Sequence, residues 1–404
     1  HFLTIMKLCW LIDSAGGGGG ASVALSCCRK AAAAGHDTTL LVRGPIEDWL
    51  EEYAHSFQLA SLDNAEGEKH RAPKLLLDWL TRNPQDVLLH NDVQPVNPAF
   101  PHLPEELRLI FVVHDTAKMY WDPAVQNERY LDAIVTVSNV IARQFRGRLN
   151  DPRRLHVAHN GTLFPDDVAL DQERADDLVF LGGGNHIKGA YDVLNVWQSL
   201  VEQGFDGTLH WFGTVGNELK ENIRALPASD QINIRGYTPR SNIFETAARS
   251  KVLLMLSRVE SFGMVTVECM GMGCLPVAWD VETGTQEIVT HGETGFFAPL
   301  ADADALADRI RTALHRHGDL HEAAINRARS TFSEEAMWDR YTEVLEAVRK
   351  RPVADRPHAG EPPPPYEPPT RYFQLLPEGV RNWIRSAVGR SPWLGYLLRD
   401  MRGL

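Results

Sequence analysis

Two glutamates eight positions apart, Glu260 and Glu268, are the side chains whose spacing most clearly suggests chemistry. The apolar run at 251–257 before them has the length of a strand, and apolar and small residues then follow at helical spacing up to Gly273. Glu260 is therefore expected where a strand passes into a helix, with Glu268 about 12 Å further along that helix at ~1.5 Å per residue. Because the free N–H groups of a helix start attract phosphate, we expect the two carboxylates to lie along a bound nucleotide.

Four motifs follow one another around these carboxylates. They read S-R-V-E-S-F-G at 257–263, E-C-M-G-M-G-C-L-P-V-A at 268–278, G-T-Q-E-I-V at 284–289 and H-G-E-T-G-F at 291–296. The segment resembles the E-x7-E signature of the retaining GT-B glycosyltransferases of family 4, which use nucleotide-activated sugars. Two glutamates at this spacing occur by chance in many sequences. The resemblance is specific because all four motifs are present in the same order.

The resemblance implies a role for each motif residue. Glu260 would bind hydroxyls of the donor sugar and act as a catalytic residue, and Glu268 would bind the ribose hydroxyls. The donor phosphates would be bound by the amides at the start of the helix. These amides belong to Ser261, Phe262, Gly263, Met264 and Val265.

A glycine turn at 178–189, L-V-F-L-G-G-G-N-H-I-K-G, resembles the family pattern f-v-G-R-l-x-x-x-K-G, in which Lys and Arg neutralise the leaving diphosphate. Lys188 matches the lysine and is a second catalytic candidate, with Gly183 and Gly184 as donor-binding residues. The family arginine falls on Gly183, so half of the cationic pair is missing. Arg258 or the amides of a glycine loop are candidates to replace it.

Two further positions resemble the family. His114 follows the apolar run 109–113 within V-V-H-D, where the family has a histidine that reaches the donor sugar, so His114 is the third catalytic candidate. Gly236, before Tyr237, resembles the stretch whose backbone flanks the nucleobase.

The glycine run 16–20 allows more than one interpretation. It follows a predicted strand and opens a predicted helix, and it can be read as G-x-G-x-x-A, the dinucleotide fingerprint. An NAD(P)-linked oxidoreductase is therefore an alternative, although the second strand ends in Val42-Arg43-Gly44 rather than in an acidic residue. In the glycosyltransferase interpretation, Gly17 and Gly18 let the backbone approach the donor or acceptor. A non-catalytic module that binds sugar nucleotides is the third alternative.

Short β-rich runs alternate with helix-length spacers in both halves of the chain, which predicts βαβ units and parallel sheets. The predicted strands are 7–12, 38–42, 87–90, 109–114, 133–137 and 155–159 in the first half, and 178–181, 208–212, 232–235, 252–256 and 275–278 in the second. The expected fold is α/β, of the GT-B kind: two Rossmann-like domains with parallel sheets that face each other across a cleft. The predicted parts are an N-terminal acceptor-side domain at 6–165, a linker at 166–177 and a nucleotide-sugar-binding domain at 178–333. The resemblance implies that a closing helix at 334–351 crosses back to the first domain.

Composition is that of an ordinary globular protein, with 404 residues that are 44% hydrophobic and 23% charged. The net charge of −12 argues against nucleic-acid binding, which needs a basic face. No apolar run is long enough to span a membrane, and we expect a cytoplasmic protein with reduced, buried cysteines and a natural start at Met6. Asp302-Ala303-Asp304 is the single D-x-D motif, and since it opens a predicted helix we interpret it as a cap rather than a metal site.

The last part of the chain differs in composition from the rest. Residues 352–370 are rich in proline and are predicted to be an extended spacer with little reason to pack. Residues 371–404 carry six arginines against two acidic side chains, and Trp393, Leu394 and Leu397 would share one helical face. This basic, aromatic tail is expected to bind an anionic membrane surface, the catalytic body or another subunit.

We therefore expect a metal-independent retaining glycosyltransferase that needs no cofactor. It would use a nucleotide-diphosphate sugar as donor and a saccharide or a lipid-linked molecule as acceptor. Its donor would bind mainly the second domain. The leaving diphosphate would take the acceptor proton during same-face substitution.

Overall fold

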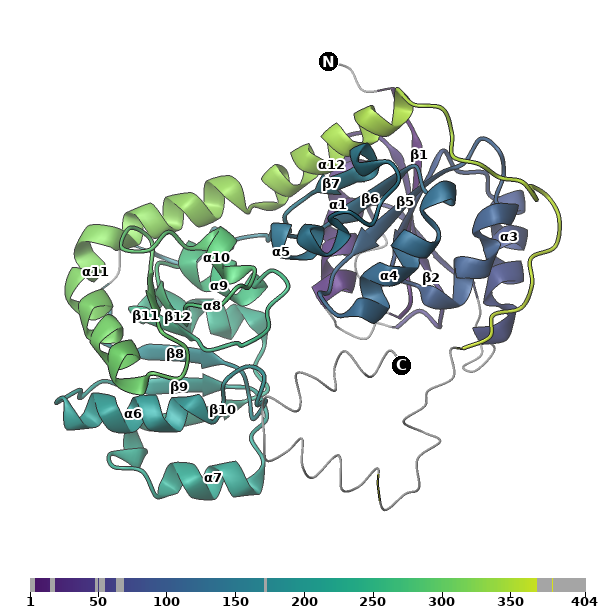
Figure 1. The fold of residues 1–404 in the computed structure, drawn as a ribbon. Coiled ribbons are helices and arrows are strands. Elements are labelled where there is room, and N and C mark those ends of the chain that lie inside the picture. The colour runs from purple at the N-terminus through teal and green to yellow at the C-terminus, as the bar shows by residue number, and fades with distance from the viewer. Residues whose placement is uncertain are drawn as a thin grey trace. The chain divides into compact units, whose positions relative to one another are not determined.

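The computed structural model describes residues 4–14, 19–47, 50, 55–62, 69–170, 173–368 and 380. The chain forms two compact units (Figure 1). The first contains His1–Gly161 and the segment that begins at Glu334, and the second contains Thr162–Ser333. Each unit is built on one parallel sheet, so the predicted α/β class with two Rossmann-like domains is confirmed.

The sheet of the first unit has seven strands in the order β3-β2-β1-β4-β5-β6-β7. Its strands are β1 (Lys7–Ile12), β2 (Asp37–Val42), β3 (Gln58–Ser61), β4 (Val87–Asn91), β5 (Arg108–Val113), β6 (Ala133–Thr136) and β7 (Leu155–Val157). All neighbours in this sheet are parallel. Because the order reverses between β1 and β4, the carboxyl ends of these two strands border the crevice where such sheets bind ligands.

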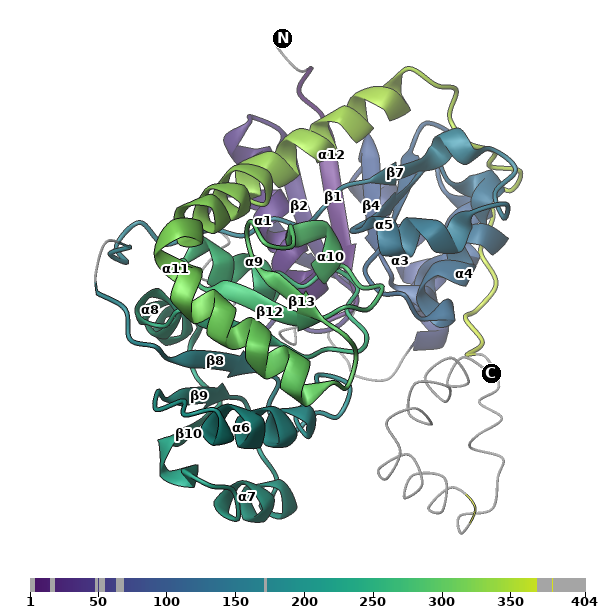
Figure 2. The ribbon, with the colours of Figure 1, turned by 60° about the vertical axis from the view of Figure 1, so that its left-hand side comes forward.

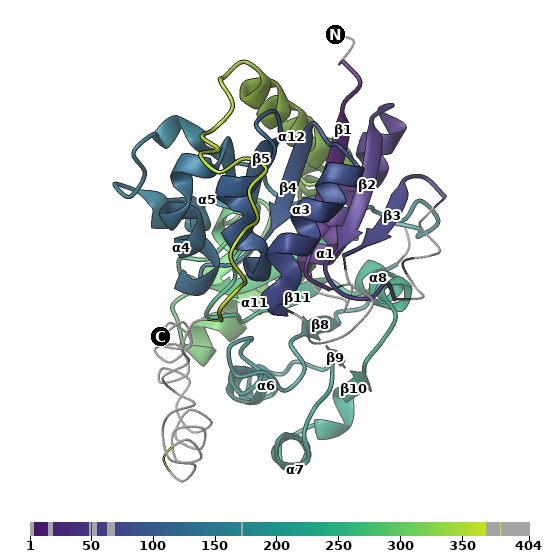
Figure 3. The ribbon, with the colours of Figure 1, turned by 90° about the vertical axis from the view of Figure 1, so that its right-hand side faces the viewer.

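Helices pack on both faces of this sheet, which explains why its central strands are almost wholly buried (Figure 3). They are α1 (Gly19–Ala33), α3 (Ala72–Arg82), α4 (Lys118–Gln126), α5 (Asn139–Ala142) and α12 (Glu334–Arg349), with short 3₁₀ turns η1 (Lys69–Arg71), η2 (Gln94–His102), η3 (Glu128–Tyr130), η4 (Arg143–Phe145) and η5 (Pro152–Arg154). The start of α12 is fixed on α1, since the buried Glu334 carboxylate forms an ion pair with Arg29 at 2.5 Å.

The sheet of the second unit has six strands in the order β10-β9-β8-β11-β12-β13. They are β8 (Leu178–Leu181), β9 (Leu209–Phe212), β10 (Ile232–Gly236), β11 (Val252–Met255), β12 (Leu275–Trp279) and β13 (Phe296–Ala298). The helices are α6 (Asp192–Glu202), α7 (Asn217–Arg224), η6 (Ser229–Gln231), α8 (Arg240–Arg249), α9 (Met264–Gly271), α10 (Thr285–Ile288) and α11 (Ala303–Thr331). Figure 2 shows α11 running across the sheet beside β12 and β13. The strand order reverses between β8 and β11.

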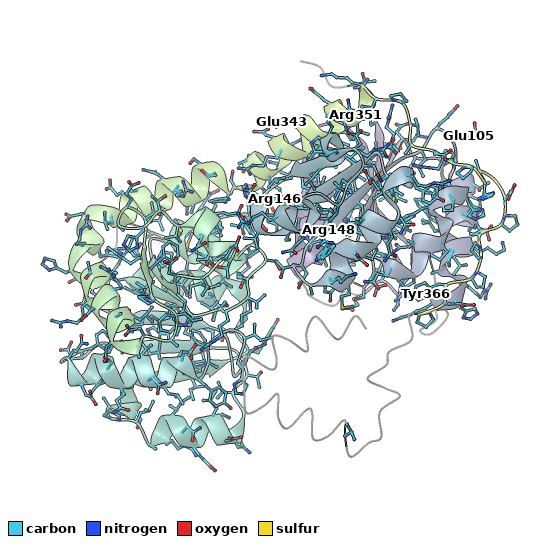
Figure 4. The ribbon with its side chains drawn as sticks, viewed as in Figure 1. Glu105, Arg146, Arg148, Glu343, Arg351 and Tyr366 are labelled. Atoms are coloured by element: carbon cyan, nitrogen blue, oxygen red, sulfur yellow. The ribbon has the colours of Figure 1, made fainter. Side chains whose placement is uncertain are left out.

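The proline-rich segment packs against the first unit, contrary to the prediction from sequence. We call residues 352–368 the strap; Figure 3 shows it in yellow-green. Figure 4 labels Arg351, just before the strap, and Tyr366, near its far end. Backbone N–H groups of His358 and Tyr366 donate to the carbonyls of Pro101 and His70, at 3.0 and 2.9 Å. The strap is therefore hydrogen-bonded along its length, even though its prolines carry no N–H donor.

One buried arginine explains why the strap packs. Arg356 forms an ion pair with Asp132 at 3.3 Å, with both side chains almost fully buried, and it donates to the carbonyls of Tyr130 and Leu107 at 2.6 and 3.1 Å. The N–H of Ala354 donates to the other Asp132 oxygen at 2.9 Å. The proline content suggested a spacer, but this arginine makes the strap part of the fold.

Three further expectations concern the cysteines, membrane-spanning helices and the tail. All five cysteines are unpaired and buried, as predicted. Within the described ranges, no helix combines the length and the apolar character needed to cross a bilayer. The predicted amphipathic tail at 371–404 lies outside the described residues, except for Val380.

Candidate donor-binding site

Three glycine-containing loops of the second unit surround an open pocket of about 610 Å³. They follow β8, β9 and β10, so the pocket lies at the carboxyl edge of the sheet, where parallel sheets bind ligands. Its lining residues are Leu181, Gly182, Gly183, Gly184, Asn185, Phe212, Gly213, Thr214, Gly216, Gly236, Tyr237, Thr238, Ile243 and Val265. Of the predicted donor-binding residues, Gly183, Gly184, Gly236 and Val265 therefore lie at this pocket.

Close contact between two of these loops explains the glycine at the family arginine position. Gly183 has a φ of +51°, and its N–H donates to the carbonyl of Phe212 at 2.9 Å. A Cβ atom on Gly183 would lie 2.9 Å from the carbonyl oxygen of Thr214, and one on Gly213 would lie 2.8 Å from the Cα of Gly183. Since no side chain fits here without movement of the backbone, this loop cannot carry the arginine that the resemblance predicts.

Lys188 and Glu260, which are 72 positions apart in the sequence, meet as an ion pair. Lys188 Nζ lies 2.6 Å from Glu260 Oε2, with the lysine side chain 39% exposed and the glutamate 15%. Both line a second, small pocket of about 20 Å³ that shares Leu181 and Val265 with the large one. The structure thus brings two predicted catalytic residues together beside the pocket, where an anion could bind the ammonium and a hydroxyl could bind the carboxylate.

The turn from Glu260 into α9 is fixed by backbone contacts. Gly263 precedes the helix with a φ of 105°, which only glycine adopts readily. The Gly284 N–H donates to the carbonyl of Glu260 at 2.8 Å, and a Cβ on Gly284 would lie 2.4 Å from the Cα of Phe262. Because the Phe262 ring is buried against Phe332, only the backbone of Phe262 can serve a ligand.

Glu268 lies within α9 and is held by an arginine that we did not predict. Its Oε1 atom accepts a hydrogen bond from Arg240 at 2.6 Å. Burial raises the pKa of Glu268 above its ordinary value, while the charge and the hydrogen bond of Arg240 lower it. Arg240 is the first residue of α8, an unusual place for a cation.

Two family models match the chain, one for each half. The model described as "Glycosyltransferase Family 4" matches residues 17–162, and the model "Glycosyl transferases group 1" matches residues 167–331. The chain belongs to the group 1, family 4 glycosyltransferases. It is accordingly a glycosyltransferase, and the NAD(P)-linked oxidoreductase is not supported.

Relatives of this glycosyltransferase are distant. It is 22% identical over 287 residues to N-acetyl-alpha-D-glucosaminyl L-malate synthase of Bacillus anthracis, a match that covers 64% of this chain and 74% of that protein. It is 25% identical over 232 residues to a putative colanic acid biosynthesis glycosyltransferase of Salmonella typhimurium, covering 54% of this chain and 57% of the relative.

Solved structures confirm the GT-B fold. A glycosyltransferase from Rickettsia africae has a TM-score of 0.71 at 16% identity and covers 86% of this chain and 100% of its own. Anabaena HepE, solved in complex with UDP, has a TM-score of 0.67 at 17% identity and covers 85% and 100%. At these identities the likeness shows the fold alone.

Arg258 of this glycosyltransferase is paired with a carboxylate of its own unit. Its guanidinium is paired with the Asp192 carboxylate, with one contact at 3.0 Å, and Trp279 Nε1–H donates to the same carboxylate at 3.2 Å. Its own N–H donates to the carbonyl of Ile187 at 2.9 Å. Arg258 thus links the Lys188 loop to the start of α6, and its charge is matched by Asp192. Sequence patterns did not indicate Asp192 or Trp279 as its partners.

His114 lies in the first unit, at the end of β5. Its Nε2 lies 3.0 Å from Asn91 Oδ1, and the Asn91 amide nitrogen donates to the carbonyls of Leu11 and Leu89. Burial lowers the pKa of His114 to about 4, so the ring is neutral at neutral pH. Because Nε2 then donates to Asn91, Nδ1 is the acceptor that a ligand hydroxyl could use.

Several predicted residues have no place in these two pockets. Gly17 and Gly18 lie outside the described residues. The predicted residues that line neither pocket are Arg258, Ser261, Phe262, Gly263, Met264 and Glu268, together with His114 of the other unit. Their predicted roles in donor binding remain predictions.

Proposed function

We propose that this glycosyltransferase moves a sugar, with retention of configuration, from a nucleotide-diphosphate sugar to a saccharide or lipid-linked acceptor. The observation that carries the proposal is the Lys188–Glu260 ion pair beside the pocket, at the start of α9. A donor would separate the two side chains: its diphosphate binds the ammonium, and hydroxyls of its sugar bind the carboxylate. These fixed charges would stabilise the oxocarbenium-like sugar and the leaving diphosphate.

The chemical step breaks the bond between the sugar carbon and the diphosphate oxygen. The acceptor oxygen bonds to the same face of that carbon, and its proton passes to the leaving diphosphate. Neutral His114 would accept a hydrogen bond from a substrate hydroxyl through Nδ1. Glu268 and the backbone at Gly236 would bind the ribose and the base, and Anabaena HepE, solved with UDP, makes UDP the first nucleotide to test.

Differential binding tests this proposal most directly. The melting temperature of the protein is measured in the presence of UDP-, GDP- and ADP-sugars and, for comparison, of NAD(H) and NADP(H). We expect stabilisation by one class of sugar nucleotide, followed by its turnover to a product of unchanged anomeric configuration by NMR. Stabilisation by a nicotinamide nucleotide alone would contradict the proposal, and binding without transfer or hydrolysis would leave a non-catalytic binding module.

Activity is expected to survive chelation of divalent metals. Both carboxylates of the D-x-D motif have structural partners, since Asp302 accepts from the Ala305 N–H at 3.0 Å and Asp304 from the Ser199 hydroxyl at 2.7 Å. We propose that Lys188 and the amides at the start of α9 meet the charge of the diphosphate instead. Turnover should remain within about twofold of its initial rate in excess EDTA, a change of under ~0.5 kcal/mol in the barrier. Loss of turnover that Mg²⁺ or Mn²⁺ restores would contradict this assignment.

Membrane attachment is proposed for the tail at 371–404, on its sequence alone. Basic residues alternating with Trp and Leu suit the surface of an anionic bilayer, and an acceptor held in that bilayer would then be within reach. The full chain should sediment with anionic vesicles in low salt, less so in high salt, and deletion of 371–404 should abolish this. Equal sedimentation of the full and shortened chains would assign the tail another role.

A further inference from the structure

The first residue of α8 breaks a local rule of helix formation. The N-terminus of a helix carries a partial positive charge, so a cation is disfavoured there, yet Arg240 opens α8. Such exceptions are expected where a residue serves a site rather than the fold. The contacts of Arg240 show which site that is.

Three groups fix the guanidinium of Arg240. It lies over the ring of Phe244, 5.1 Å from the centroid, one turn along α8. It donates to the hydroxyl of the buried Thr162 and, at 2.6 Å, to Oε1 of Glu268. The guanidinium is therefore held by three neighbouring groups, although the Arg240 side chain is 48% exposed.

Only one of the two Glu268 oxygens is used by this contact. Among the residues that the structure describes, Oε2 has no hydrogen-bond partner, and it is not one of the buried polar atoms left without one. An ionised carboxylate can accept at both oxygens. With Oε1 on Arg240, Oε2 remains for a hydroxyl of a ligand.

The same arginine is joined directly to the wall of the large pocket. Gly236, Tyr237 and Thr238 line that pocket, and Pro239 and Arg240 follow them without a gap. The loop is itself anchored, because the Gly213 N–H donates to the carbonyl of Gly236 at 2.7 Å. Arg240 thus connects the pocket wall to the carboxylate on α9.

We infer that Arg240 is a positioning residue for nucleotide recognition, which orients the Glu268 carboxylate and aims its second oxygen at the ribose diol. The inference rests on the proposed function, since it presumes that a nucleotide occupies the pocket. It goes beyond that function by assigning ribose recognition to an arginine–glutamate pair rather than to Glu268 alone.

Binding of two nucleotides that differ only in the ribose tests this role. Calorimetry is to compare UDP with 2′,3′-dideoxy-UDP, or the matching GDP or ADP pair if thermal unfolding favours that base. We expect Arg240→Ala to weaken UDP binding about tenfold, the loss expected for a hydrogen bond to a charged group. Arg240→Ala should leave the affinity for dideoxy-UDP within twofold of wild type. The affinity of Arg240→Lys for UDP should lie between those of wild type and Arg240→Ala.

A matched control and a double-mutant cycle measure the contribution of the Arg240–Glu268 contact itself. Arg249→Ala removes an exposed arginine from the other end of α8 and should leave both affinities unchanged. Glu268→Ala should weaken UDP binding about 10- to 100-fold, and adding Arg240→Ala should weaken it by less than a further twofold. Thermal unfolding of each variant checks that the second unit remains folded.

The outcomes separate the inference from the proposed function. If Arg240→Ala lowers the affinities for UDP and dideoxy-UDP equally, Arg240 supports only the local fold. If the losses of UDP affinity in the double-mutant cycle are additive, Arg240 acts independently of Glu268. Wild-type affinity in Arg240→Ala would likewise overturn the inference while the proposed function stands. Failure of the wild type to bind any of the three nucleoside diphosphates would overturn both.

Discussion

Replacing Lys188 with alanine is expected to lower kcat about 100- to 1,000-fold, the range found when one fixed group that stabilises transition-state charge is removed. Lys188 is the only lysine or arginine in the loop 182–189, because glycine occupies the position of the family arginine. His186 does not substitute for it, since burial lowers the pKa of its ring and favours the neutral form. In the proposed mechanism, the Lys188 ammonium is therefore the main side-chain group that neutralises the leaving diphosphate.

Steady-state kinetics with the best donor measures this effect. Lys251→Ala is the matched control: Lys251 also forms an ion pair, with Asp176 at 2.5 Å, but lines neither pocket. Its kcat should remain near that of wild type, and Lys188→Arg should recover part of the loss because it restores the charge. A kcat for Lys188→Ala within threefold of wild type, in a protein that still unfolds cooperatively, would rule out Lys188 as the principal cation.

Strands with strong apolar runs could be predicted to within about a residue. Leu178–Leu181 was predicted with its observed bounds, and the strand predicted at 252–256 is observed at Val252–Met255. Two strands were missed, Gln58–Ser61 and Phe296–Ala298. Both are short strands at the edges of their sheets, where pairing with one neighbour outweighs weak local patterns.

Site residues that belong to a sequence motif could be predicted. Their contact partners could not, because these come together only through the tertiary fold. Lys188 and Glu260 were predicted separately, and the structure shows that they meet. The sequence showed glycine at the position of the family arginine, though not that the close approach of Gly183 and Gly213 leaves no room there for a side chain. Asp192 could not be found, since nothing in its local sequence indicates that Arg258 lies beside it. Arg240 was also missed; the signal that could have found it is a cation at the first position of a helix, which the structure shows to be α8.

Replacing Arg356 with alanine is expected to lower the free energy of unfolding of the first unit by about 3 kcal/mol, the lower end of the cost of breaking a buried ion pair. The side chains of Arg356 and Asp132 are 1% and 2% exposed, so the charge left on Asp132 cannot be solvated. The lower end applies because Arg108 lies 3.6 Å from Asp132 and the Leu109 N–H still donates to it at 2.8 Å. The carbonyls of Leu107 and Tyr130 would also lose a donor.

A neighbouring ion pair between η3 and the strap provides the control for this loss. Arg129 and Asp355 form an ion pair at 3.4 Å with both side chains 61% exposed, so Arg129→Ala should change the free energy of unfolding by at most about 1 kcal/mol. Denaturant unfolding compares the two variants. Nucleotide affinity should be unchanged in both, because every residue that lines the pocket belongs to the second unit. Equal, small losses in the two variants would mean that the strap rests on the first unit without stabilising it, as a spacer would.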